Sequence, residues 1–99
     1  MVEEINDVKF EEILNNKKVL VDCFATWCGP CRMLSPIIDE LASEITDYKF
    51  YKLDVDNSTE VTKKYGIMSI PTLLIFEDGN LKEKVVGFIS KDELTDKLK

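Results

Sequence analysis

The most restrictive feature of the sequence is an apolar run at residues 19–25, Val-Leu-Val-Asp-Cys-Phe-Ala. A strand formed by this run would be apolar on both faces, as expected of a central strand covered by helices on each side. Helical and strand-like apolar spacings alternate along the rest of the chain. The sequence therefore predicts an α/β fold with this run near the middle of the sheet. Asp22 is the exception, because it places a carboxyl group among apolar neighbours.

Apolar spacing, capping residues and turns predict the remaining elements. Strands are expected at residues 2–5, 18–25, 50–55, 72–76 and 81–86. Helices are expected to begin at Asn6 or Asp7, at Cys28, at Asn57 and at Ser90. Asp78-Gly79 predicts a hairpin that joins the last two strands. We expect a mixed five-stranded sheet flanked by four helices, in a single domain that covers residues 1–99.

The charge balance narrows the range of partners. Thirteen Lys and Arg stand against 19 Asp and Glu, which gives a formal net charge of -6. Such a surface repels nucleic acid phosphates and anionic membranes. The N-terminal segment is acidic where a secretory signal would be basic, and no long apolar run follows it. We therefore expect a cytoplasmic monomer that acts on proteins or small molecules.

Two of the three cysteines, Cys28 and Cys31, are separated by Gly29 and Pro30 at the start of an amphipathic helix. Three cysteines are too few for the disulfide framework of a small secreted protein, so redox chemistry or metal binding comes into question. A thiolate at a helix N-terminus meets unpaired N–H groups and the positive end of the dipole, which lowers the pKa of Cys28. Cys28 is thus the candidate nucleophile, and Cys31 the second thiol that resolves a mixed disulfide intramolecularly.

The residue pattern also allows an interpretation of Asp22. A lone ionised carboxylate in an apolar strand is costly, so its pKa should rise, and raised carboxyl groups suit proton transfer. A structurally paired acid is the alternative. Cys23 should project from the opposite face of the strand and is expected to pack as a small apolar side chain.

Residues 21–33, Val-Asp-Cys-Phe-Ala-Thr-Trp-Cys-Gly-Pro-Cys-Arg-Met, resemble the active-site segment of the thioredoxin family nearly position for position. The likeness continues through Pro36 and residues 52–56, 65–67, 69–72 and 86–87. The resemblance implies the thioredoxin fold and a protein-disulfide reductase, in which Cys28 attacks a substrate disulfide and Cys31 releases the reduced substrate. It further implies that a thioredoxin reductase regenerates the dithiol, and that the chain needs no bound cofactor or metal.

The resemblance also implies a set of accessory residues. Asp22, with Lys52 nearby, would assist deprotonation of Cys31, and a cis peptide bond would join Ile70 to Pro71 beside the cysteines. Lys52 could equally be an ordinary exposed lysine at a strand end, and isomer frequencies alone favour a trans turn proline at position 71. The docking surface for disulfide-containing substrate proteins would comprise Trp27, Gly29, Pro30, Ile70, Pro71, Val86, Gly87 and Phe88. Any of these could instead be a simple packing or turn residue.

Three other functions use the same features. A zinc site shares the Cys-x-x-Cys spacing, but the sequence has no histidine and no second cysteine pair to complete it. A disulfide oxidase or isomerase would use the same attack, although Gly-Pro between the cysteines favours the reductase, because oxidising relatives commonly carry histidine there. A binding module that uses the apolar rim without turnover is the third alternative.

Overall fold

The computed structural model describes residues 2–99 of the chain. Its strands are β1 (Glu3–Ile5), β2 (Lys18–Phe24), β3 (Lys49–Asp54), β4 (Thr72–Glu77) and β5 (Asn80–Val86). Its helices are α1 (Asp7–Ile13), α2 (Gly29–Glu44), α3 (Thr59–Lys64) and α4 (Lys91–Leu98), and a 3-10 turn, η1 (Val55–Asn57), precedes α3. Within residues 2–99 these are the five strands and four helices that the sequence predicts, in the predicted order.

The strands form one mixed sheet in the order β1-β3-β2-β4-β5. β3 runs parallel to both β1 and β2, whereas β4 pairs antiparallel with β2 and with β5. The β4–β5 hairpin turns at Asp78 and Gly79, whose φ angles of 53° and 80° are those of the hairpin turn that Asp-Gly favours. The apolar run therefore lies at the centre of the sheet, as predicted, with a strand on either side.

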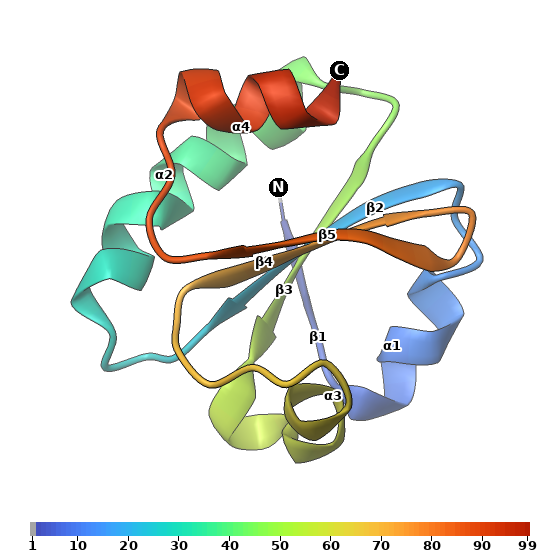
Figure 1. The fold of residues 1–99 in the computed structure, drawn as a ribbon, viewed down its shortest axis with the longest axis vertical. Helices are drawn as coiled ribbons and strands as arrows, with labels where there is room; N and C mark the ends of the chain where they lie inside the picture. The colour runs from blue at the N-terminus through green and yellow to red at the C-terminus, as the bar shows by residue number, and fades with distance from the viewer. Residues whose placement is uncertain (1) are drawn as a thin grey trace.

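Helices cover both faces of the sheet (Figure 1). Leu20 of β2 belongs to the core cluster under α2 and α4, which also contains Leu34, Ile38, Leu41, Phe50, Leu73, Ile75, Leu94 and Leu98. Val19, Val21 and Cys23 belong to the cluster under α1 and α3, with Phe10, Ile13, Leu53, Val61, Leu74 and Phe76. Because side chains alternate along a strand, Asp22 faces the α2 side and Cys23 faces the opposite side, as predicted.

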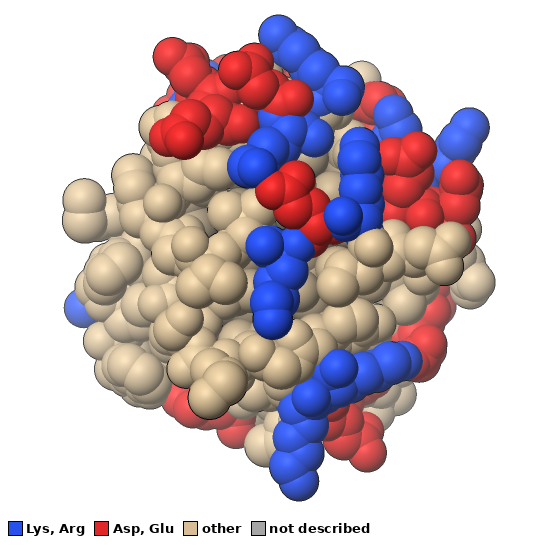
Figure 2. All heavy atoms as spheres, in the orientation of Figure 1, with Lys and Arg blue, Asp and Glu red and all other residues tan. Residues whose placement is uncertain are grey.

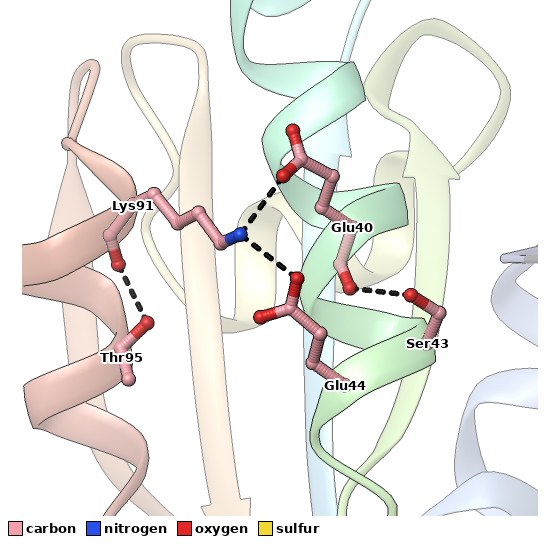
Figure 3. Close-up of polar contacts among 5 residues, drawn as sticks. All are labelled: Glu40, Ser43, Glu44, Lys91 and Thr95. Atoms are coloured by element: carbon pink, nitrogen blue, oxygen red, sulfur yellow. Dashed lines mark hydrogen bonds and ion pairs between the residues drawn. The ribbon is translucent and has the colours of Figure 1, made fainter.

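Polar contacts fix α4 against α2 at the surface (Figure 3). The Lys91 ammonium, in the first turn of α4, lies 2.8 Å from a carboxylate oxygen of Glu40 and 2.8 Å from one of Glu44, both on α2. These two hydrogen bonds raise the pKa of Lys91. Ser90 caps α4 as the sequence predicts, because its hydroxyl accepts from the Glu93 N–H at 3.2 Å.

The predicted cap of α3 by Asn57 is wrong. Asn57 lies in η1, where its amide donates to Asp54, and the N-cap position of α3 is Ser58, whose side chain makes no cap hydrogen bond. The open amides of α3 are satisfied by Asp7 of α1, whose carboxylate accepts from Glu60 N–H at 3.1 Å and from Val61 N–H at 3.0 Å. The local capping pattern does not predict the cap here, because a side chain from another helix accepts these N–H groups.

Candidate active site

The two cysteines of the predicted pair occupy the first turn of α2, just beyond the end of β2. Cys28 is the N-cap residue, and its Sγ accepts a hydrogen bond from the Cys31 N–H at 3.2 Å. Pro30 fits at the start of the helix because the first N–H groups of a helix have no partner within it. Cys28 and Cys31 are joined in a disulfide with a Cα–Cα distance of 5.3 Å. Each cysteine is only 4% exposed, so little of the disulfide is open to solvent.

A cis peptide bond joins Ile70 to Pro71 in the segment between α3 and β4, as the resemblance implied. Ile70 packs against the small cluster formed by Ala25 and the two cysteines. The Gly87 N–H donates to the Pro71 carbonyl at 2.8 Å, and Gly87 itself has a φ of +91°. The fold thus brings Ile70 to the cysteines and ties Pro71 to Gly87.

Asp22, in β2, is 5% exposed and lines a cavity together with Cys31. Burial raises the pKa of this carboxyl to about 7; the charge of Lys52 acts against the shift and that of Asp39 adds to it. Within residues 2–99, Asp22 Oδ1 has no hydrogen-bond partner. The raised pKa that the sequence predicts is therefore present and is caused by loss of hydration.

A cavity of about 240 Å³ connects Asp22 to the active-site helix. Its lining residues are Asp22, Phe24, Ala25, Thr26, Cys31, Arg32, Ser35 and Lys52. Lys52 is the register partner of Asp22 across β2 and β3, and its ammonium lies 6.0 Å from the ring centroid of Phe24. Arg32 donates to the Thr26 carbonyl at 3.1 Å. Two cations, one buried acid and one cysteine thus share the same small space.

A larger and more open hollow of about 390 Å³ lies elsewhere. It is lined by Glu3 of β1, Ala42 of α2, Thr46 and Tyr48 of the loop between α2 and β3, and residues 49–51 of β3. Lys49 begins β3, whereas Asp54 ends it beside the active-site turn, so this hollow lies toward the other end of the sheet. It is lined by neither Cys28 nor Cys31, whereas Cys31 lines the smaller cavity.

An exposed apolar rim accompanies the disulfide. Its large side chains are Trp27 (67% exposed), Met33 (66%), Met68 (96%), Val86 (58%) and Phe88 (51%). Figure 2 shows a broad uncharged surface on the side where α2 begins, while charged residues gather over α4 and on the other side of this face. Exposed apolar groups gathered beside a reactive disulfide favour a protein partner.

One contact near the site was not predicted from the sequence. Asp56 accepts a hydrogen bond from the Trp27 indole at 2.9 Å. Asp56 follows β3 and is 29 residues from Trp27, so only the pairing of β2 with β3 brings the two together.

A cysteine pair that begins a helix and closes to a disulfide is the reactive group of thiol–disulfide exchange. Together with the mixed sheet and the adjacent cis-proline, it defines the class of thiol–disulfide oxidoreductases. The thioredoxin family model matches residues 1–99, and the chain belongs to the thioredoxin family.

Individual relatives agree with this assignment. The chain is 46% identical over 95 residues to the thioredoxin of Mycoplasmoides gallisepticum (strain R(low / passage 15 / clone 2)), covering 95% of each protein. It is 46% identical to the thioredoxin of Listeria monocytogenes serovar 1/2a, covering 95% of this chain and 92% of that protein. Among solved structures, a mutant thioredoxin from Halobacterium salinarum superposes with a TM-score of 0.89 at 38% identity, covering 95% of this chain and 84% of that one.

The family settles the class of reaction. The chain is a protein-disulfide reductase, and its substrates are proteins that contain disulfides. Residues 2–99 contain no group of three or more His, Cys, Asp or Glu side chains arranged to hold a metal ion. Over the same residues, no helix is long and apolar enough to cross a membrane.

Proposed function

We propose that Cys28 is the attacking thiol and Cys31 the resolving thiol of this reductase. The single observation that supports these roles is the position of Cys28 at the N-cap of α2, where its sulfur accepts the Cys31 N–H. The same donor and the unpaired amides of the first turn stabilise a thiolate on Cys28 in the reduced protein. The resolving thiol is already within reach, because the two cysteines close to a disulfide without leaving the helix.

The proposed catalytic cycle consists of two thiol–disulfide exchanges. The Cys28 thiolate attacks one sulfur of the substrate disulfide; the substrate S–S bond breaks, and the other substrate sulfur leaves as a thiolate that takes a proton. The Cys31 thiol loses its proton and attacks Cys28 Sγ in the mixed disulfide, which releases the second substrate thiolate. The substrate gains two electrons, and the protein is left with the Cys28–Cys31 disulfide seen in the structure.

We infer that Asp22 accepts the proton of Cys31. Both residues line the same cavity, which has room for several water molecules, each occupying about 30 Å³ in the liquid. A carboxyl group with a pKa of about 7 is suited to exchange a proton near neutral pH. Lys52, which also lines the cavity and is the register partner of Asp22 across β2 and β3, favours the ionised form of Asp22 and limits the rise in its pKa.

The docking surface proposed for the substrate follows the rim of the disulfide. Trp27, Ile70, Val86 and Phe88 would supply apolar contacts, and Gly29, Pro30, Pro71 and Gly87 would shape the backbone around them. Pro71 has no N–H and stands directly before β4, so the ladder of backbone hydrogen bonds ends there. An extended substrate segment could continue it from this point.

We further propose that the chain acts as a single-domain monomer in the cytoplasm and that a thioredoxin reductase returns it to the dithiol form. The assignment to the thioredoxin family supports the reductase. The acidic composition, with a formal charge of -6, supports a partner other than nucleic acid or an anionic membrane.

Single cysteine variants test the assigned roles. With a protein that contains one accessible disulfide as substrate, Cys28→Ser should be inactive, and Cys31→Ser should accumulate a mixed disulfide through Cys28 that mass spectrometry detects. Cys23→Ser is the matched control, because Cys23 is buried on the other face of β2, and it should keep near wild-type turnover. Full activity in Cys28→Ser would refute the assignment.

A further inference from the structure

The segment between α3 and β4 carries the part of the site that protein substrates are proposed to contact. It leaves α3 at Tyr65, exposes Met68 almost completely, and ends at the cis-linked Pro71. Between these points, Ile70 packs against the cysteine cluster. Figure 1 shows this segment reaching the start of β4 at the end of the sheet where α2 begins. Its position decides how Ile70 and Pro71 face a substrate.

Backbone hydrogen bonds close the C-terminus of α3 only in part. The Gly66 N–H donates to the Lys63 carbonyl at 3.2 Å and the Ile67 N–H to the Thr62 carbonyl at 2.9 Å. With Gly66 at φ +60°, these are the two bonds of a Schellman motif. The motif leaves the carbonyls of Tyr65 and Gly66 pointing out of the helix, at its negative end.

The side chain of Lys84, on the edge strand β5, donates hydrogen bonds to these two carbonyls. Its ammonium lies 3.2 Å from the Tyr65 oxygen and 3.4 Å from the Gly66 oxygen. The lysine comes from a different element, 18 to 19 residues further along the chain. A cation that donates to the last carbonyls of a helix is favoured both by hydrogen bonding and by the helix dipole.

The same strand also holds the other end of the segment. Val86 of β5 pairs with Thr72 of β4, and the Gly87 N–H donates to the Pro71 carbonyl at 2.8 Å. β5 therefore holds residues 65–71 at both ends, through the Lys84 side chain at the beginning and the Gly87 backbone at the end. Of these two contacts from β5, only that of Lys84 depends on the identity of a side chain; from β4, the Thr72 hydroxyl also donates to the Ser69 carbonyl at 2.7 Å.

We propose that Lys84 is a positioning residue for substrate recognition, which holds the segment 65–71 in the conformation that protein disulfides bind. The inference rests on the proposed docking surface. Lys84 itself touches neither cysteine nor the cavity at Asp22. Its loss should therefore weaken binding of a protein substrate and leave the exchange chemistry of Cys28 unchanged.

Steady-state kinetics with two substrates test this proposal. For Lys84→Met, we expect KM for a protein disulfide to rise by roughly threefold while kcat stays at the wild-type value. This is the result expected when a variant loses binding that is equally strong in the substrate complex and in the transition state. The rate with a small aromatic disulfide, which needs only the Cys28 sulfur, should not change. Lys84→Arg keeps a cationic donor and should restore most of the wild-type KM.

Lys82→Met is the matched control. Lys82 lies on the same strand, carries the same charge and pairs with Glu77 at 3.5 Å instead of with the segment. If Lys82→Met raises KM as much as Lys84→Met does, the effect is one of net charge and the proposal fails. It also fails if Lys84→Met lowers the rates with both substrates equally, or changes neither. Activity retained by Cys28→Ser would instead refute the proposed function, whatever Lys84 does.

Discussion

The indole Nε1 of Trp27 donates a hydrogen bond to Asp56 Oδ2 over 2.9 Å, although 29 residues separate the two along the chain. The ring is 67% exposed, and such a side chain would otherwise be free to rotate. The bond ties the residue before Cys28 to the turn that follows β3. An exposed aromatic ring with a fixed orientation is suited to contact a protein partner.

Trp27 should report the redox state of the site. It is the only tryptophan of the chain and adjoins Cys28, so reduction of the Cys28–Cys31 disulfide should change its emission. The change should be reproduced in Cys23→Ser, which keeps the pair, and lost in Cys28→Ser. Fluorescence spectra recorded before and after reduction check this, and an identical pair of wild-type spectra would contradict the placement of Trp27 beside the disulfide.

Asp22 should make the oxidised protein less stable as the pH rises. Its pKa is about 7 in the folded protein and near 4 in an unfolded chain. Between these values the folded protein holds a proton that the unfolded chain has lost, so the free energy of unfolding falls as pH rises from about 4 to about 7 and levels off above.

Asp22→Asn removes this dependence. The variant should exceed the wild type in stability by up to about 4 kcal/mol at pH 8, since one pKa unit corresponds to about 1.4 kcal/mol, and should lose that advantage at pH 4. Urea unfolding of both oxidised proteins at the two pH values measures the difference. A gain in stability of the same size at both pH values would show that packing, rather than ionisation of Asp22, causes the difference.

Asp7 should stabilise the fold by capping a helix other than its own. Its carboxylate accepts two backbone N–H groups of α3, at 3.0 and 3.1 Å. Asp7→Ala leaves both donors without this partner and should lower the free energy of unfolding by roughly 1–2 kcal/mol. Asp7→Asn keeps an acceptor oxygen and should recover part of the loss. Denaturant unfolding compares the three proteins, and an unchanged midpoint in Asp7→Ala would count against the cap.

The reduction potential should be that of a reductant. The two residues between the cysteines are Gly29 and Pro30, and neither is a histidine. The reduced form therefore lacks the extra stabilisation of the thiolate that makes a disulfide a strong oxidant. We expect a potential well below the value of about -120 mV that is typical of strong disulfide oxidases. Equilibration of the Cys28–Cys31 pair with glutathione buffers measures it. A value close to that of the oxidases would reassign the chain to disulfide formation.

Local patterns predict most of the fold because they act over short distances. The apolar run of β2, the Asp78-Gly79 turn and the Ser90 cap each depend on a few neighbouring residues, and each lies where the sequence places it. The cysteine pair at the start of α2 is equally local. The raised pKa of Asp22 also follows from its neighbours, because a carboxyl group in a strand buried on both faces loses its hydration wherever the helices lie.

The contacts that escape prediction join distant parts of the chain. Asn57 has the local sequence pattern of a helix cap. The acceptor of the Glu60 N–H is instead the Asp7 carboxylate, 53 residues before Glu60 in the chain. Asp56 and Lys84 look like ordinary surface charges in the sequence. Their partners, the Trp27 indole and the carbonyls that end α3, become neighbours only when the sheet assembles. One-dimensional spacing carries no signal for such pairs.

The alternation of side chains along β2 puts Cys23 on the face opposite Asp22, and this limits the number of sulfurs that can exchange electrons with a partner. Cys23 is fully buried under α1 and α3, and burial raises the pKa of its thiol, so it stays in the form that does not exchange. The sheet thus separates an inert sulfur from two reactive ones. The folded protein presents one couple to its partners, and reducing equivalents pass through it in pairs, with no third thiol to divert a half-finished exchange.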